Sequence, residues 1–313
     1  MKNPIIFLIT LFLIGCSGGF VYKDAPALEF SDLDYGFPSK FVTVNGIKIS
    51  YIDEGSGNNT LVLVHGLASN GGFWRSNIGE LSKHYRVIAV DLPGYGKSDK
   101  GVYPYTMTFY ADVVSGLLQK LNVAKVVYVG HSMGGQIGIH FSFRHKDQLE
   151  RLILAAPAGI EPFSRGDGDW LKSVMTIDFV KKTPEDRVRA NLAMNFYNYD
   201  NKFEWMVEER ARMAKAKDFE DFCYAVIRSV SGMIDEPTTK RLKDISVPTH
   251  LIFGENDGLI PNPILHGGSA AEVAKIGTDA IPNVTLTFIP GAGHMLQLEK
   301  PEEFNMRIIE LVK

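Results

Sequence analysis

Short runs of apolar residues, many of them β-branched, recur along the chain, and segments with helical spacing separate several of them. Some runs are apolar at every position, which is typical of strands buried on both faces of a sheet. Asn45-Gly46 lies between the first two runs and predicts an antiparallel hairpin. The later alternation of strand and helix predicts an α/β fold with a mostly parallel eight-stranded sheet and helices on both faces. The predicted strands cover residues 41–44, 47–52, 61–64, 87–90, 126–129, 152–155, 250–253 and 285–289, and the clearest helices cover residues 105–121 and 136–144.

The alternation stops after the sixth run. Residues 159–243 contain no strong strand pattern, are rich in Lys, Glu, Arg, Met and aromatic residues, and have helix-like stretches at 185–195 and 203–217. The strand pattern returns at Val247-Pro248-Thr249-His250. We therefore predict that residues 159–243 form a helical cap inserted into a core domain of residues 37–158 and 244–313.

Residues 1–15 have the character of a signal peptide. Lys2 supplies a positive charge, and residues 5–14 are almost wholly apolar. This apolar run is too short to span a membrane as a helix and has the length of a signal-peptide core. Residues 16–36 show little periodicity, and we predict that they form a tether between the N-terminus and the core domain.

The end of the apolar run, Leu13-Ile14-Gly15-Cys16, resembles the lipobox of bacterial lipoproteins. This resemblance implies that Cys16 becomes the acylated first residue of a mature protein held at a membrane of the bacterial cell envelope. The residue after Cys16 is Ser17. In bacterial lipoproteins an aspartate at this position implies retention at the inner membrane, so the resemblance favours the outer membrane in a host with two membranes. A plain secretory signal with an incidental cysteine is the alternative.

Composition narrows the function classes. The formal net charge of −3 and the lack of a basic cluster argue against nucleic acid as a partner. Only one other cysteine is present, Cys223, so acylation of Cys16 leaves no intrachain disulfide. Cys223 lies in an apolar stretch and is expected to be buried. No cluster of His, Cys and carboxylate residues has the spacing of a metal site, and we expect neither a metal nor an organic cofactor.

The motif Gly130-His131-Ser132-Met133-Gly134 follows the predicted strand 126–129 and precedes a helical stretch. A serine on a sharp turn between strand and helix exposes its hydroxyl, and the outer glycines permit the close approach of strand and helix. Ser132 is therefore a candidate nucleophile. A G-x-S-x-G pattern also arises by chance in a chain with 30 glycines, so the strand and helix on either side are what favour this interpretation.

Four further motifs follow predicted strands in order: His65-Gly66, residues 91–98 (DLPGYGKS), Gly254-Glu255-Asn256-Asp257 and Gly293-His294. With the serine motif they make the chain, from about Phe37 to Lys313, resemble an α/β-hydrolase with a helical cap.

The resemblance implies a Ser132, Asp257, His294 triad in the chain order of that fold. His294 follows a strand in a glycine-flanked loop and is the expected base, while Asp257 is expected to orient it. Glu255 is the alternative acid. The backbone N–H groups of Leu67 and Met133 are the expected oxyanion donors.

His65, His131 and residues 91–98 are expected to have structural rather than catalytic roles. His65 is expected to shape the oxyanion loop by hydrogen bonding, and His131 to pack within the serine turn. Residues 91–98 lack the spacing of a phosphate-binding loop, and the resemblance implies only a structural role for them.

These features predict hydrolysis of a carboxylic ester through an acyl-enzyme on Ser132, with a small-molecule ester or a lipid as substrate. A serine nucleophile argues against the related haloalkane dehalogenases and epoxide hydrolases, which use an aspartate there. Lipidation with a capped fold also resembles the membrane-anchored bacterial lipases. The same triad suits hydrolysis of carbon–carbon, lactone or amide bonds and perhydrolysis, and a non-catalytic binding lipoprotein is a further alternative. Candidate acyl-pocket residues are Phe73, Trp74, Phe163 and Trp170, which could equally be core.

Overall fold

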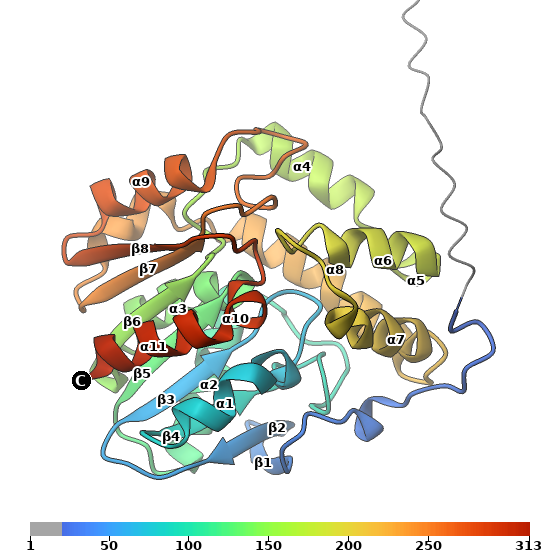
Figure 1. Ribbon diagram of the computed structural model, residues 1–313, viewed down its shortest axis with the longest axis horizontal. Helices are drawn as coiled ribbons and strands as arrows, with labels where there is room; N and C mark the ends of the chain where they lie inside the picture. The colour runs from blue at the N-terminus through green and yellow to red at the C-terminus, as the bar shows by residue number, and fades with distance from the viewer. Residues whose placement is uncertain (1–20) are drawn as a thin grey trace, which may run out of the picture.

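The computed structural model describes residues 21–313, and an eight-stranded sheet lies at the centre of this part of the chain (Figure 1). The strand order is β1-β2-β4-β3-β5-β6-β7-β8. β2 is antiparallel to both of its neighbours, and the pairs from β4 to β8 are parallel. The predicted fold class and all eight predicted strands are confirmed. The strands are β1 (Lys40–Val44), β2 (Ile47–Glu54), β3 (Thr60–Val64), β4 (Arg86–Val90), β5 (Val126–His131), β6 (Leu149–Ala155), β7 (Thr249–Gly254) and β8 (Val284–Ile289).

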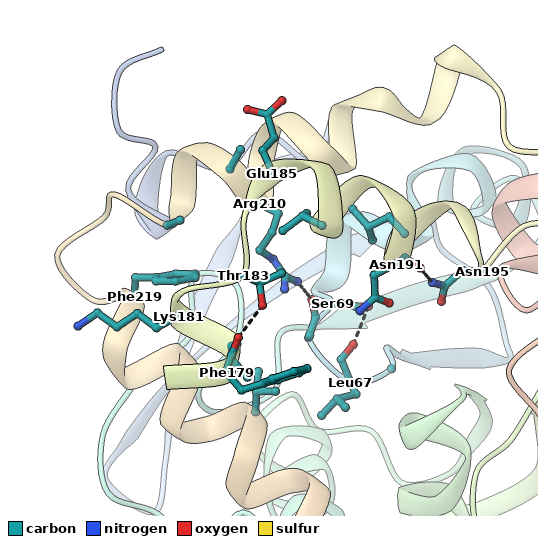
Figure 2. Close-up of a pocket in the computed structure, with 18 of the residues that line it drawn as sticks. Leu67, Ser69, Phe179, Lys181, Thr183, Glu185, Asn191, Asn195, Arg210 and Phe219 are labelled. Atoms are coloured by element: carbon teal, nitrogen blue, oxygen red, sulfur yellow. Dashed lines mark hydrogen bonds between the residues drawn. The ribbon is translucent and has the colours of Figure 1, made fainter. Parts of the chain in front are cut away.

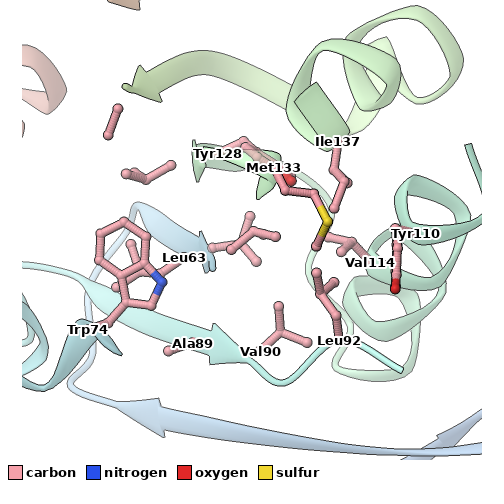
Figure 3. Packing of buried hydrophobic residues seen from close by; sticks show 14 of the residues in the cluster. Leu63, Trp74, Ala89, Val90, Leu92, Tyr110, Val114, Tyr128, Met133 and Ile137 are labelled. Atoms are coloured by element: carbon pink, nitrogen blue, oxygen red, sulfur yellow. The ribbon is translucent and has the colours of Figure 1, made fainter. Parts of the chain in front are cut away.

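Residue chemistry explains the hairpin and the central strands. Asn45 and Gly46 have φ angles of +50° and +84°, the left-handed values that a tight antiparallel turn requires. In β3, Leu61 to Val64 are all fully buried, because helices cover both faces of the sheet. Figure 3 shows this core, in which side chains of the central strands pack with Trp74 and with Val114 and Ile137 of neighbouring helices.

Six helices surround the sheet, and none in residues 21–313 has the length and apolar character needed to cross a bilayer. α3 packs on β5 and β6 beside α2, whereas α1, α10 and α11 pack together. α9 covers β7 and β8. The helices are α1 (Arg75–Leu81), α2 (Met107–Lys120), α3 (Met133–Arg144), α9 (Ala270–Ala280), α10 (Leu296–Glu299) and α11 (Pro301–Val312).

Between β6 and β7 the described chain is helical and contains no strand. The final helix of this insertion differs from the others, since Phe222, Cys223 and Ala225 on α8 are at most 1% exposed and belong to the main hydrophobic core. Burial raises the pKa of Cys223 to about 11. The insertion is therefore joined to the core by α8 and is not a separate unit. Its helices are α4 (Arg165–Val174), α5 (Ile177–Lys181), α6 (Glu185–Ala193), α7 (Glu204–Met213) and α8 (Phe219–Asp235).

The predicted tether over residues 16–36 is wrong for the described part of that segment. Phe30, Leu33 and Tyr35 are 1–3% exposed and are part of the core. The Tyr35 hydroxyl also donates a hydrogen bond of 2.9 Å to the buried carboxylate of Asp91. Their irregular spacing carries no helical or strand period, so the pattern did not reveal their burial. The predicted signal peptide and Cys16 lie outside the described residues.

Truncation of Phe30 tests whether this N-terminal segment is structural. Its ring lies 5.5 Å from that of Phe222, and Phe30→Ala should lower the free energy of unfolding by about 3–5 kcal/mol. Phe41→Ala is the matched control, because Phe41 is 46% exposed and its loss should cost within about 0.5 kcal/mol. Urea unfolding measures both variants. If both variants lose an equally small free energy of unfolding, residues 21–36 act as a tether after all.

Candidate active site

Ser132 lies between β5 and α3 in a strained backbone conformation, with φ +54° and ψ −118°. Such angles are rare for a residue with a side chain and persist only where surrounding contacts hold them. The Ser132 N–H donates to the carbonyl of Ala155, at 3.0 Å. A Cβ on Gly130 would meet the carbonyl of Gly134, and one on Gly134 would meet the carbonyl of Val64. These two positions therefore require glycine, as the sequence pattern indicated.

His294 and Asp257 come together at the edge of the sheet where β7 and β8 end. The two strands are parallel neighbours, with Gly254 opposite Ile289, so the loops after them start side by side. His294 Nδ1 lies 2.9 Å from Asp257 Oδ2, and the two side chains are 4% and 0% exposed. Because a carboxylate only accepts hydrogen bonds, Nδ1 carries the proton and Nε2 is left free as a base.

The environment of Asp257 keeps its carboxylate charged. Oδ1 accepts hydrogen bonds from the N–H groups of Leu259 and Ile260, at 2.8 and 3.0 Å. Burial acts to raise the pKa of Asp257, but the charge and hydrogen bond of His294, together with these two amides, outweigh it and hold that pKa below its usual value. Glu255, the alternative acid, is exposed to solvent and forms no hydrogen bond or ion pair with His294. The geometry favours Asp257.

The loop after β3 lies against the serine turn. A Cβ on Gly66 would lie 3.0 Å from the Cβ of Ser132. His65 shapes this loop: its Nδ1–H donates to the Gly66 carbonyl at 2.8 Å, and its Nε2 accepts from the Leu92 N–H at 3.1 Å. Burial lowers the pKa of His65, so the ring is neutral and can donate through Nδ1 while it accepts through Nε2.

The predicted oxyanion donors are available. Within residues 21–313 the N–H groups of Leu67 and Met133 donate to no other protein group. Met133 is the first residue of α3, where a helix has no carbonyl one turn back to accept its N–H. Leu67 follows Gly66, which touches Ser132, so two free amides adjoin the serine. The Met133 side chain itself is buried in the core (Figure 3).

His131 does not act as an alternative base in this arrangement. Its Nε2–H donates to the His294 carbonyl oxygen at 2.9 Å, and the two rings lie 4.8 Å apart. Burial, and then the neighbouring His294, lower the pKa of His131 to about 3. His131 therefore remains neutral and packs beneath the His294 loop.

A cavity of about 530 Å³ joins the serine turn to the helical insertion (Figure 2). Its walls are mainly apolar, and Ser132, His131 and His294 all contribute to them. The apolar walls come from the sheet domain and from α5, α6, α7 and α8. These lining residues include Leu67, Phe73, Met175, Phe179, Val180, Val188, Leu192, Phe219, Val226, Leu259 and Met295.

Of the four predicted acyl-pocket residues, only Phe73 lines this cavity. Trp74 is fully buried and packs 6.1 Å from Phe304 in the core, so its assignment to the pocket is wrong. Phe163 and Trp170 are 39% and 42% exposed and do not line the cavity either. Both lie before Met175, the first residue of the insertion that lines the cavity.

Two charged residues that the sequence did not single out hold the site together. The buried carboxylate of Glu299 accepts hydrogen bonds from the N–H groups of Gly293, Tyr197 and Asn198, at 2.7, 3.1 and 2.6 Å. It thus ties the His294 loop to the insertion. The Arg210 guanidinium, on α7, donates to the Ala68 carbonyl at 2.5 Å, beside Leu67. Neither residue belongs to a recognisable motif, because its role depends on backbone groups far along the chain.

Within residues 21–313 no group of three or more His, Cys, Asp or Glu side chains is arranged to hold a metal ion. Ser132, His294, Asp257 and the two free amides supply the site with a hydroxyl, an imidazole, a carboxylate and two N–H donors.

Comparison with known proteins agrees with this geometry. A family model described as alpha/beta hydrolase fold matches residues 59–301. The chain is 28% identical over 277 residues to a 2-hydroxy-6-oxo-6-(2'-aminophenyl)hexa-2,4-dienoic acid hydrolase of Metapseudomonas resinovorans, covering 86% of this chain and 88% of that protein. It is 29% identical over 264 residues to a pimeloyl-[acyl-carrier protein] methyl ester esterase of Pectobacterium atrosepticum, covering 82% and 95%.

Among solved structures, a probable hydrolytic enzyme from Pseudomonas aeruginosa PAO1 superposes with a TM-score of 0.80 at 27% identity, covering 92% of this chain and 99% of that one. An esterase from Exiguobacterium antarcticum shares the fold, with a TM-score of 0.74 at 24% identity over 88% and 99%. The family model alone spans well over half of the chain. The protein belongs to the alpha/beta hydrolase fold family.

Proposed function

We propose that this protein is a serine hydrolase that cleaves carboxylic esters, with Ser132 as nucleophile, His294 as base and Asp257 as the residue that orients the base. The observation that carries the proposal is the hydrogen bond between His294 and Asp257 at the wall of the same cavity that Ser132 lines. A related esterase at 29% identity supports the choice of an ester bond.

In this mechanism the Ser132 hydroxyl attacks the acyl carbon while His294 Nε2 removes its proton. Asp257 accepts the hydrogen bond of Nδ1 and stabilises the imidazolium that forms. The oxygen of the tetrahedral intermediate accepts hydrogen bonds from the N–H groups of Leu67 and Met133. His294 returns the proton to the leaving alcohol. A water molecule, deprotonated by His294, then attacks the acyl-enzyme and releases the acid.

The shape and lining of the cavity suit an acyl group. Apolar side chains from the sheet domain and the insertion surround it, and apolar contact is how a protein binds a hydrocarbon chain. The substrate is then a small-molecule ester or a lipid whose acyl part lies against Phe73, Leu192 and Met295.

Hydrolysis of an oxo-dienoic acid is the second candidate. A relative at 28% identity is named for such a reaction, and the Arg210 guanidinium lines the cavity, where it could bind a carboxylate. The same nucleophile and base would serve this carbon–carbon cleavage. Turnover of nitrophenyl esters compared with an oxo-dienoic acid distinguishes the two candidates.

We also propose that Cys16 is acylated and that the protein is anchored at a membrane of the cell envelope, the outer membrane where two are present. The proposal rests on Leu13-Ile14-Gly15-Cys16 at the end of an apolar run. More than one acyl chain is needed for stable anchoring, because each buried methylene contributes only about 0.8 kcal/mol.

Ser132→Ala should abolish ester turnover and covalent labelling by a fluorophosphonate probe, because no other group can form the acyl-enzyme. The matched control is Ser69→Ala, which removes a hydroxyl from the same cavity and should keep labelling intact. A correctly folded Ser132→Ala protein that retains wild-type turnover would exclude the serine mechanism.

Asp257→Asn should lower kcat by about 10⁴, because an amide can hold the wrong imidazole tautomer. Glu255→Gln, in the same loop but facing solvent, should leave kcat within about twofold of the wild type, in line with the small effects of exposed substitutions. Steady-state kinetics on a nitrophenyl ester measures both. A large loss in Glu255→Gln with an active Asp257→Asn would reverse the assignment of the acid.

Cys16→Ala should move the protein out of the membrane fraction while the rate on a water-soluble ester stays unchanged. Cell fractionation measures the distribution, and mass spectrometry of the wild-type N-terminal peptide detects the acyl groups. A wild-type Cys16 without lipid would contradict the anchoring proposal.

A further inference from the structure

The N-terminal segment Val21–Leu28 is bound along the helical insertion. The backbone N–H groups of Val21 and Tyr22 donate to the two carboxylate oxygens of Glu185, the first residue of α6, both at 2.9 Å. The Tyr22 hydroxyl donates to Glu204, the first residue of α7, at 3.2 Å. In Figure 1 this segment runs beside α7 before it reaches β1.

Arg212, near the end of α7, and Lys215, just after that helix, also bind this segment. Lys215 Nζ donates to the carbonyls of Tyr22, Lys23 and Ala25, at 3.1, 2.7 and 2.6 Å. Arg212 Nε donates to the carbonyl of Pro26 at 3.1 Å, and the Arg212 carbonyl accepts from the Leu28 N–H at 3.3 Å. These contacts satisfy much of the backbone of the segment, so its position relative to the insertion is specified.

The same segment borders the cavity that contains Ser132. Tyr22, Lys23 and Lys215 line the cavity, as do Ser132 and His294. The side chains of His294 and His131 are buried, whereas Lys23, Phe179, Lys181 and Lys215 are exposed. The cavity therefore meets solvent at these exposed side chains, and Figure 2 shows two of them, Phe179 and Lys181, in its lining.

The rim of this opening combines apolar and cationic side chains. Val21 is 66% exposed and Phe179 is 59% exposed. Lys23, Lys181 and Lys215 supply the cationic side chains: Lys181 Nζ pairs with Glu220, and Lys215 Nζ donates to backbone carbonyls of the segment, which do not cancel its charge. The carboxylate of Glu185, also in the lining, accepts from the N–H groups of Val21 and Tyr22 and pairs with Arg189. Exposed apolar groups beside lysines are the composition of surfaces that bind anionic membranes.

Chain length places this rim close to an anchor on Cys16. Val21 lies five positions after Cys16, so their Cα atoms are at most about 18 Å apart even in a fully extended chain. The polar headgroup layer of a bilayer leaflet is itself about 5–7 Å thick. An acyl chain inserted at Cys16 therefore holds Val21 and the neighbouring opening within a short distance of the membrane surface.

We propose that the face formed by Val21, Tyr22, Lys23, Phe179, Lys181 and Lys215 docks on an anionic bilayer surface, and that the substrate is a membrane-resident acyl ester which enters the cavity from the bilayer. This inference rests on the ester hydrolysis and acylation proposed above. Entry at the surface lets an acyl chain pass from lipid to the apolar cavity without full exposure to water, which is unfavourable for each methylene.

The test lengthens the connection between anchor and cavity. An insert of about twelve Gly and Ser residues between Gly18 and Gly19 raises the root-mean-square distance between Cys16 and Val21 from about 12 Å to about 23 Å and leaves residues 21–313 unchanged. The full, acylated chain is reconstituted in vesicles of phosphatidylcholine and phosphatidylglycerol. Each sample is assayed on a long-chain ester embedded in the vesicles and on a water-soluble butyrate ester. The control carries the same insert after Lys313.

The insert before Gly19 should lower the rate on the embedded ester by about tenfold, because the effective concentration of the opening at the surface falls, and should leave the rate on butyrate unchanged. The control should match the wild type on both substrates. Replacing phosphatidylglycerol by phosphatidylcholine should lower only the rate on the embedded ester.

Equal rates on the embedded ester for the insert, the control and the wild type would overturn this inference while ester hydrolysis stands. A wild type that fails to hydrolyse butyrate and resists the fluorophosphonate probe would instead overturn the proposed function. A wild type that is active on butyrate but carries no lipid on Cys16 would overturn the docking geometry.

Discussion

The close approach of three backbone segments around Ser132 is the constraint on which the candidate site depends. The end of β5, the start of α3 and the loop after β3 meet where only glycine fits at positions 130 and 134. That contact holds Ser132 at a positive φ and leaves the N–H groups of Met133 and Leu67 free beside it. A larger residue at either glycine would separate the strand from the helix and displace the Ser132 hydroxyl and both amides at the same time. The nucleophile and the oxyanion donors therefore form one structural unit.

Buried carboxylates fix the loops around this unit. Asp91 accepts from the N–H groups of Gly71 and Lys97 and from the Tyr35 hydroxyl. Asp257 and Glu299 each accept from backbone amides of their own or adjoining loops. Charge-assisted bonds of this kind are stronger than bonds between neutral groups, and a buried carboxylate left without them would be costly. Loops without regular secondary structure are thereby held in single conformations.

The helical insertion is coupled to this machinery at several points. Glu299 links the His294 loop to residues 197 and 198, and Arg210 binds the loop that carries Leu67. Phe73 and Met295 pack with Phe196, Phe203 and Met206 in a small apolar cluster separate from the main core. The walls of the cavity and the groups proposed to act on substrate are therefore joined, so a change in the insertion can affect both binding and the position of the base.

The amino-acid sequence by itself determined the sheet, the strand ends and the residues that follow them. Continuous apolar runs set the eight strands, and the carboxyl ends of parallel strands necessarily place Ser132, Asp257 and His294 at one edge of the sheet. Local glycine patterns identified the serine turn, because the steric demand at Gly130 and Gly134 is short-range. These features depend on periodicity and on contacts between residues near one another in the chain.

Only the tertiary structure decided which side chains line the cavity and where residues 21–36 lie. Phe73 and Trp74 are adjacent aromatic residues, yet one borders the cavity and the other is buried against Phe304. Phe30 and Tyr35 have no periodic spacing, and they are buried because α8 and Asp91 supply partners far along the chain. Glu185, Glu299 and Arg210 likewise bind backbone groups that only the folded chain brings near. Composition and spacing cannot specify such partners, since each depends on three-dimensional proximity between distant segments.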